Sequence, residues 1–219
     1  MAKTKTRDAV VDALLALAAE EPWEKVTLAA IAERADVSLA ALRVQFDGRL
    51  AILAEYTRRI DEEVLKGIDP ELKDEGPRER LFDVLFARFE AHNPHKAALK
   101  GIARAALADP LLALALNRLV TQSMAWMLAG AGIFATGRRG LLRAQGLALV
   151  WARVMRTYLN DDDPELARTM AALDKRLREA ERAVVCLGRL ERIVDRCCAP
   201  ARRARPAPGD GDLPEGHPT

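Results

Sequence analysis

The fold is decided by the stretch VTLAAIAERADVSLAALRVQFDGRLAIL, residues 26–53. Apolar residues recur in it at the three- and four-residue spacing of helices, interrupted once by Ala-Asp-Val-Ser. Thr27 and Ser38 each precede one of the two apolar runs, and hydroxyl side chains at such positions cap helix N-termini. Leu42 and Phe46 share one face of the second run. The stretch therefore predicts two short helices joined by a tight turn.

The residues around this turn allow the two helices to pack closely. Ala32 and Ala35 are small, and Val37 can fill the turn. A further helix is expected before the stretch and a longer one after it, from about residue 49 to 67. This is the pattern of a helix-turn-helix, which leaves the first turn of its second helix free to enter a DNA major groove. A plain three-helix subdomain would show the same spacing, so both interpretations stay open.

Composition favours a helical protein from a reducing compartment. The chain has 219 residues, 50% hydrophobic and 30% charged, with a net charge of +2. This suits a folded domain and neither demands nor excludes a nucleic-acid partner. The cysteines Cys186, Cys197 and Cys198 lie near the end, where no disulfide framework can form, which predicts a cytoplasmic protein. No apolar run reaches the roughly eighteen uncharged residues of a membrane span.

Helical periodicity continues to about residue 196, without an alternating strand pattern. Asp69, Asp109 and Asp163 each stand before a proline, the arrangement of an N-cap followed by the first helical residue. The predicted helices cover 77–92, 95–107, 110–129, 138–160 and 164–196, the last with a break near Gly188. The Pro- and Gly-rich segment 199–219 has little to bury and is expected to be a disordered tail. The fold class is therefore all-α, a helix-turn-helix domain leading into a helical bundle.

Residues 26–53 resemble the TetR-type transcriptional regulators. The residues that match the family pattern are Thr27, Ile31, Ala32, Ala35, Val37, Ser38, Leu42, Phe46, Ile52 and Leu53. The resemblance covers about residues 5–60 and implies a DNA-binding domain there, with a bundle for ligand binding and dimerisation over 68–198. It also implies a homodimer that binds a palindromic operator in double-stranded DNA and releases it when a small molecule fills the bundle.

Several positions depart from the family pattern. The turn glycine is Asp36, the phosphate-contacting tyrosine is Arg43, the histidine is Gln45, and Arg49 replaces a lysine. Arginines at these positions can hold phosphates, the Gln45 amide can donate a hydrogen bond, and apolar side chains can touch thymine methyl groups. The residues expected at the DNA are Thr27, Ser38, Leu39, Ala40, Arg43, Gln45 and Arg49.

Charge counts against tight non-specific binding. Residues 1–60 contain nine basic and nine acidic side chains, whereas DNA-binding domains usually gather positive charge. An N-terminal arm with Lys3, Lys5 and Arg7 is expected to offset this by reaching the DNA backbone.

The bundle sequence contains large, soft side chains that either fill a core or line an apolar cavity. The resemblance places a hydrophobic small molecule among them. The residues expected to line its pocket are Phe86, Phe89, Trp126, Met127, Trp151 and Tyr158.

Patterns that imitate catalytic or metal sites have simpler explanations. His92 and His95 flank Asn-Pro and lack a further Cys or His to complete a metal site. The glycines between 130 and 140 precede Arg-Arg rather than the Lys-Ser/Thr of a phosphate loop. Asp161, Asp162 and Asp163 lack the alternating ligands of a calcium loop. We therefore expect no enzyme activity, no metal and no cofactor.

A second resemblance supports an alternative. Residues 158–177 resemble the TetR-fold lipid-binding proteins of ubiquinone biosynthesis through Thr169, Leu173, Asp174 and Arg176. It implies a lipid- or isoprenoid-binding protein without DNA binding. Residues 176–206 carry nine basic and four acidic side chains, and the apolar residues Ala183, Leu187, Leu190 and Val194 recur among them at helical spacing. This segment is therefore either an amphipathic helix on an anionic membrane or the last bundle helix with a solvated arginine face.

Overall fold

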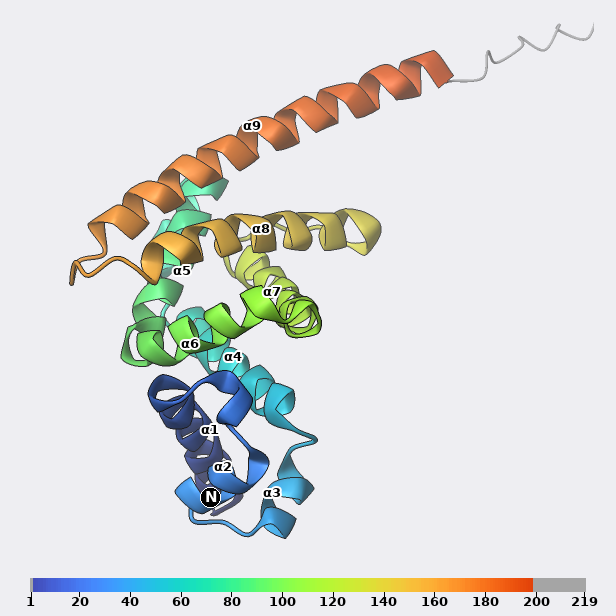
Figure 1. Cartoon of the computed structure of the whole chain (residues 1–219). Coiled ribbons are helices and arrows are strands. Elements are labelled where there is room, and N and C mark those ends of the chain that lie inside the picture. Colours follow the sequence, from blue (N-terminus) through green and yellow to red (C-terminus); the bar gives the residue numbers. More distant parts are fainter. Residues whose placement is uncertain (1, 199–219) are drawn as a thin grey trace, which may run out of the picture. The chain divides into compact units, whose positions relative to one another are not determined.

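The structure is a computed structural model, and it describes the backbone of residues 2–198 and the side chains of residues 5–184. The described backbone is helical and contains no strand, which confirms the all-α prediction (Figure 1). The expected disorder of the tail 199–219 lies outside the described residues. The first helices are α1 (Ala2–Glu20), η1 (Trp23–Lys25), α2 (Leu28–Arg34), α3 (Leu39–Gln45) and α4 (Arg49–Lys66).

The helix-turn-helix forms as its capping residues predict. The Thr27 hydroxyl accepts a hydrogen bond of 3.1 Å from the Ala30 amide at the start of α2. The Ser38 hydroxyl accepts a bond of the same length from the Ala41 amide at the start of α3. Each bond satisfies one of the amides that a helix N-terminus leaves without a partner. Asp36, between the two helices, has a φ of 53° and so occupies the left-handed region where the family has glycine.

The remaining helices follow the predicted bounds within one or two residues up to residue 158. They are η2 (Pro70–Asp74), α5 (Pro77–His92), η3 (Asn93–His95), α6 (Lys96–Ala108), α7 (Pro110–Gly130), α8 (Gly137–Tyr158) and α9 (Ala167–Cys198). Pro77 and Pro110 stand at the first helical position, where a missing amide hydrogen costs nothing.

The start of α9 corrects the expectation that it begins after Asp163. The Asp163 carboxylate accepts from the amides of Glu165 and Ala167, so it stabilises a turn first. Leu166 has a φ of 53°, which ends this turn and delays the helix to Ala167. No break occurs near Gly188, because the helix is continuous there. Residues 2–182 form one compact unit, and the described residues 183–198 belong to a second.

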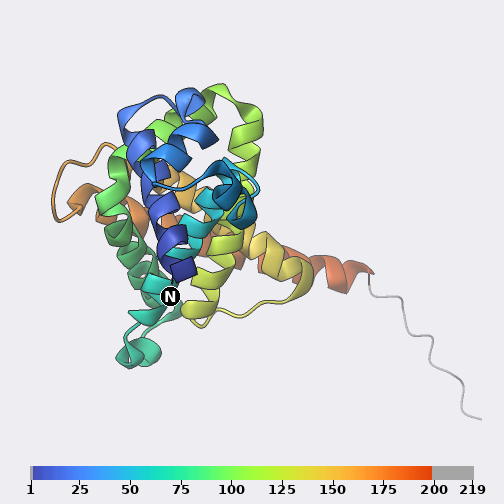
Figure 2. The ribbon, with the colours of Figure 1, turned by 90° about the horizontal axis from the view of Figure 1, so that it is seen from below.

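Within the first unit, the helix-turn-helix packs directly on the bundle. Helix α6 lies along α1, and the approach is close at Gly101, where a Cβ atom would stand only 2.6 Å from the carbonyl oxygen of Ala18. Helix α4 begins in the helix-turn-helix and continues against α5 and α7. Figure 2, seen from below, shows the N-terminal helices lying across the bundle.

The bundle core contains one buried ion pair among apolar side chains. Arg88 of α5 donates to Asp61 of α4, and both side chains are almost completely buried. The Ser123 hydroxyl of α7 donates to the same carboxylate at 2.7 Å. The Arg88 guanidinium also lies 5.3 Å from the ring centroid of Trp151 on α8. The pair therefore ties four helices together at one point.

The expectation that no run is long and apolar enough for a membrane span is wrong by length and composition: within the described part of the chain, α7 alone passes that test. About one third of the most apolar part of α7 is buried inside the structure. Met124 and Met127 are among its buried residues. Its outer side and the segment that joins it to α8 are exposed at the edge of the molecule (Figure 2).

Candidate nucleic-acid interface

Helix α3 has an inner face that anchors it and an outer face without a partner. Leu42 and Phe46 are 2% and 4% exposed, as their spacing predicts. On the outer face Leu39 is 54% and Val44 79% exposed, and Ala40 is exposed as well. These exposed side chains leave the outer face of α3 available for contact with another molecule. The first turn of α3 therefore stands free to contact a partner.

Arg43 points away from the protein core on this outer face. Its guanidinium makes an ion pair of 2.6 Å with Asp47, one helical turn later. Both side chains are exposed, so water screens the pair and it contributes little to stability. A phosphate group could replace the Asp47 carboxylate at little cost.

The Arg49 side chain, by contrast, makes its contacts within the protein. Its guanidinium donates to the carbonyl oxygens of Trp23 and Val26, at 2.6 and 2.9 Å. It also lies 4.6 Å from the centroid of the Trp23 ring. These contacts fasten the N-terminus of α4 to η1. A role of Arg49 in phosphate binding stays a prediction, and it would require the release of these contacts.

Three other residues expected at the DNA, Thr27, Ser38 and Gln45, have polar atoms that are engaged in caps or buried inside the protein. The hydroxyl groups of Thr27 and Ser38 accept the capping bonds, which leaves their hydrogens available as donors. The amide oxygen of Gln45 is buried without a hydrogen-bond partner among the described residues. The structure therefore gathers Ser38, Leu39, Ala40 and Arg43 at one exposed surface.

Arg7 of α1 is a supporting residue whose role the sequence pattern did not reveal. Helix α1 already begins at Ala2, which corrects the expectation that Arg7 belongs to a flexible N-terminal arm. The Arg7 guanidinium donates to the backbone carbonyl of Gln45 and to the Glu55 carboxylate, and it lies 4.7 Å from the Phe46 ring centroid. It therefore holds the C-terminal end of α3 against α1 and α4.

The Glu55 carboxylate forms ion pairs with two arginines, Arg7 and Arg58. Hydrogen bonds from Arg58 and then from Arg7 lower the pKa of the Glu55 carboxyl group from 4.5 to about 2, although burial acts in the opposite direction. The group therefore stays ionised under all physiological conditions.

The six side chains expected around a ligand occupy different environments. Phe89, Met127, Trp151 and Tyr158 are buried, Phe86 is half-buried, and Trp126 is 57% exposed. The rings of Phe89 and Trp151 stack with centroids 4.0 Å apart, and Tyr158 lies 5.0 Å from Phe89. Whether these rings bind a ligand stays a prediction.

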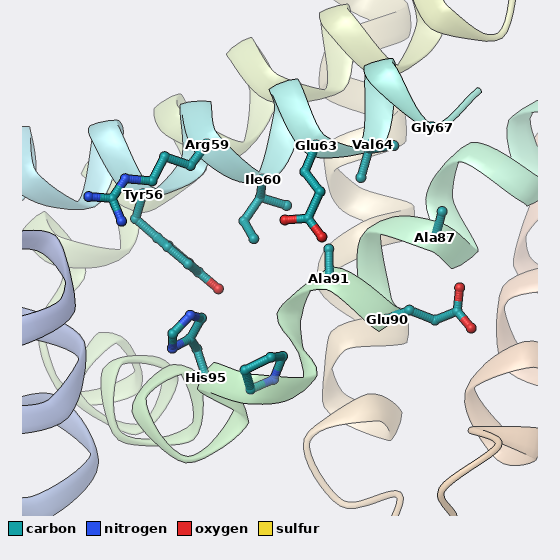
Figure 3. Close-up of a pocket in the computed structure, with 11 residues that line it drawn as sticks. Tyr56, Arg59, Ile60, Glu63, Val64, Gly67, Ala87, Glu90, Ala91 and His95 are labelled. Atoms are coloured by element: carbon teal, nitrogen blue, oxygen red, sulfur yellow. The ribbon is translucent and has the colours of Figure 1, made fainter. Parts of the chain in front are cut away.

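A groove of about 590 Å³ lies between α4 and the α5–η3 corner (Figure 3). Tyr56, Ile60 and Glu63 line it from α4, and His95 lines it from the other side. Burial lowers the pKa of His95, so its ring is neutral at pH 7. The groove therefore has a mixed lining, in which Tyr56 and Ile60 stand beside the charged side chains of Arg59, Glu63 and Glu90.

Tyr56 connects the groove to the buried ring cluster of the bundle. Its hydroxyl and the buried His92 share a hydrogen bond of 2.7 Å, and the His92 ring centroid lies 5.8 Å from that of Trp151. A ligand in the groove would touch Tyr56, which is one end of this series of ring contacts. A second groove of about 480 Å³ lies where η1 and the start of α4 face the α6–α7 corner, and Trp23 and Leu112 contribute to it.

No group of three His, Cys, Asp or Glu residues that could hold a metal ion occurs among the described residues.

The residues that carry the resemblance to the lipid-binding proteins contact other parts of the protein. The amide and hydroxyl of Thr169 donate to Asp161 at 2.8 and 2.7 Å, Leu173 is fully buried, and Asp174 pairs with Arg78 of α5. These residues fasten the first turns of α9 to the bundle.

Comparison with solved structures identifies the architecture. A TetR transcriptional regulator from Nitrosomonas europaea superposes with a TM-score of 0.63 and 22% identity, covering 80% of this chain and 97% of that one. A TetR transcriptional regulator from Rhodococcus sp. RHA1 gives a TM-score of 0.57 and 19% identity over 82% and 97% of the two chains. No protein-family model and no curated protein sequence matches the chain. The chain therefore has the fold of the TetR transcriptional regulators.

Proposed function

We propose that this protein is a DNA-binding transcriptional regulator, a repressor that works in the cytoplasm. The observation that carries the proposal is the outer face of α3, where Leu39, Arg43 and Val44 are exposed on a helix whose other face is buried. Its position, as the second helix of a capped helix-turn-helix, is that of a recognition helix. The shared fold with TetR regulators supports the same function.

In this proposal α3 enters the major groove by its first turn. Leu39 and Ala40 contact base edges, where apolar side chains favour thymine methyl groups. Arg43 exchanges Asp47 for a phosphate, and the Ser38 hydroxyl donates to a second one. Because residues 1–60 carry as many acidic as basic groups, binding to non-operator DNA is weak.

Operator binding requires two copies, since one helix-turn-helix contacts too few base pairs for useful specificity. The outward face of α8 suits a partner helix. Leu142 and Leu149 are 71% and 50% exposed there, and no atom approaches a Cβ position at Gly146. Two such faces, together with α9, would form the interface of a homodimer on a palindromic operator. A Gly146→Arg variant is then expected to sediment as a 24.1 kDa monomer.

The ligand of the regulator is a small molecule with an apolar body. The α4–α5 groove supports this, because Tyr56 and Ile60 line it together with a few charged side chains, and Tyr56 contacts the buried rings of His92 and Trp151 behind it. Because α4 begins directly after α3, a ligand there can shift the recognition helix and release the operator.

The test is binding to DNA of the protein's own upstream region and to sequences selected from a random pool. Wild-type protein should retard a short palindrome at low salt. An Arg43→Glu variant should lose this binding, and a Leu107→Glu variant, altered at an equally exposed site on α6, should keep it. Failure to enrich any palindrome from the pool would contradict the proposal.

A further inference from the structure

Helices α7 and α8 form an antiparallel hairpin whose register is set by one polar cluster. The Gln145 amide accepts from Asn117 at 3.2 Å and from the Thr121 hydroxyl at 2.9 Å, and it donates back to Asn117 at 3.1 Å. Residues after Thr121 on α7 and before Gln145 on α8 therefore lie on the same side of this cluster, toward the connecting segment. We call this end the hairpin tip.

The hairpin tip exposes large apolar side chains. They are Trp126, 57% exposed, Phe134, 79% exposed, and Leu141, 66% exposed. They are not displaced core residues, because Met124, Met127 and Leu147 already fill the inside of the same hairpin. Such a concentration on one end of a molecule marks a contact surface.

The connecting segment holds Phe134 outward through a fixed backbone. The amides of Gly132 and Ile133 donate to the last carbonyl groups of α7, and Gly132 has a φ of 71°. Arg80 of α5 donates to the carbonyl of Ala131 at 2.8 Å, and Arg143 donates to that of Phe134 at 3.4 Å. The exposure of Phe134 is thus a consequence of ordered structure.

The charge of the same region has one sign. Residues 110–160 contain six arginines and no acidic residue, and three of them, Arg138, Arg139 and Arg143, stand at the tip. Exposed apolar side chains and arginines therefore alternate along the start of α8, from Phe134 to Arg143.

We propose that the hairpin tip docks on the surface of an anionic lipid bilayer. The arginines would meet the headgroups, while Trp126, Phe134 and Leu141 would enter the boundary of the acyl chains. A nucleic acid offers phosphates but no apolar layer for these side chains. A second tip would bring three further arginines and repel. A bilayer surface supplies both the charge and the apolar layer.

The contact can be followed with the protein's own tryptophans. Trp23 and Trp151 are 6% and 3% exposed, so Trp126 is the tryptophan that can change its surroundings on docking. Full-length protein is mixed with vesicles of phosphatidylcholine alone, or with about one-third phosphatidylglycerol. We expect co-sedimentation and a blue shift of the emission only with the anionic vesicles. Raising salt from about 0.1 to about 0.5 M should release the protein.

Variants separate the tip from other surfaces. Phe134→Ser with Leu141→Ser, and separately Arg138→Glu with Arg143→Glu, should each weaken partitioning by about tenfold or more. Lys100→Glu with Arg104→Glu is the matched charge control, because both side chains are exposed on α6. Leu107→Ser with Leu114→Ser is the matched apolar control, because these side chains, at the end of α6 and the start of α7, are 81% and 67% exposed.

The controls should bind vesicles as the wild type does, and all variants should unfold at the same temperature, since every changed side chain is exposed. Two results would overturn the proposal. One is a wild-type protein that ignores anionic vesicles at low salt. The other is equal binding by tip variants and wild type, which would assign the contact to a different surface.

Discussion

The Arg49 guanidinium lies over the ring of Trp23, 4.6 Å from its centroid, and donates to the Trp23 carbonyl oxygen at 2.6 Å. The N-terminus of α4 is thereby fixed to η1, next to the exposed surface of α3. Arg43 and Arg49 flank the same turn but make different kinds of contact. Arg43 is exposed and exchangeable, and Arg49 is part of the protein's internal structure.

This difference predicts two separate phenotypes. Arg49→Ala should lower the free energy of unfolding by about 1–3 kcal/mol, because a stacked guanidinium and two hydrogen bonds are lost. Arg43→Ala should leave the unfolding transition unchanged and weaken DNA binding, with a salt dependence reduced by about one counterion. Urea unfolding and a salt series of DNA titrations distinguish them.

Asp47→Asn provides the complementary variant. It frees Arg43 and removes a negative charge from the surface of α3, so DNA binding should become tighter on every sequence. Unchanged affinity in Asp47→Asn would mean that Arg43 does not contact phosphate.

Asp36 predicts a stabilising substitution in the turn. Its φ of 53° costs free energy for any residue with a Cβ atom, and aspartate tolerates it better than most. Asp36→Gly should raise the free energy of unfolding by about 0.5–1 kcal/mol, and Asp36→Val should lower it by more than about 1 kcal/mol. Thermal unfolding of both variants measures this, and a destabilised Asp36→Gly would show that the Asp36 side chain itself is needed.

The buried pair of Arg88 and Asp61 predicts a non-additive double variant. Arg88→Met leaves the Asp61 carboxylate buried without its counter-ion and should cost about 3–5 kcal/mol. Asp61→Leu combined with Arg88→Met removes both charges and should recover most of that loss. A double-mutant cycle in urea gives the coupling, and strictly additive effects would contradict it.

Glu55 predicts how the contact between α1 and α4 responds to acid. Its pKa is lowered to about 2 in the folded protein, so it contributes stability above pH 4.5, and this is lost as the pH falls toward 2. The contribution at pH 7 is on the order of 2 kcal/mol, reduced by solvent around the exposed Arg58. Glu55→Gln should therefore be clearly less stable than wild type at pH 7 and nearly equal to it near pH 2.

The measurement is the urea midpoint of both proteins across this pH range. Glu24→Gln is the control, because Glu24 is an exposed acid without a partner in the described contacts. Its midpoint should follow that of the wild type at every pH. A constant gap between Glu55→Gln and wild type would place the loss in packing rather than charge.

Local patterns in the sequence were sufficient to predict most of the helices and their N-terminal caps. Thr27 and Ser38 form the predicted capping bonds, and Asp109 caps α7 through the amides of Leu111 and Leu112. These interactions join residues two or three positions apart, so the spacing of residue types already contains them. The start of α9 was missed because the left-handed Leu166 carries no such signal.

The functional surface was less accessible to sequence reasoning, because its contacts join distant residues. Arg49 to Trp23 spans 26 positions and Arg7 to Glu55 spans 48, and no local spacing reveals which arginine is engaged. Whether a side chain is exposed also depends on residues that are distant in the sequence. Trp126 and Met127 are neighbours in one apolar run, yet only the packing of α7 on α8 turns the first outward and the second inward.

The contact between Gly101 and Ala18 has a consequence for how this chain can evolve. At 2.6 Å, even one added methyl group at position 101 would push α6 away from α1, so no other residue type leaves the spacing unchanged. A mutation there would change how α1 packs on α6 while leaving the exposed side chains of α3 and the lining of the α4–α5 groove unchanged. In the regulator that we propose, a change at this single position would therefore alter how strongly ligand binding and DNA binding are coupled, without any change in what is bound.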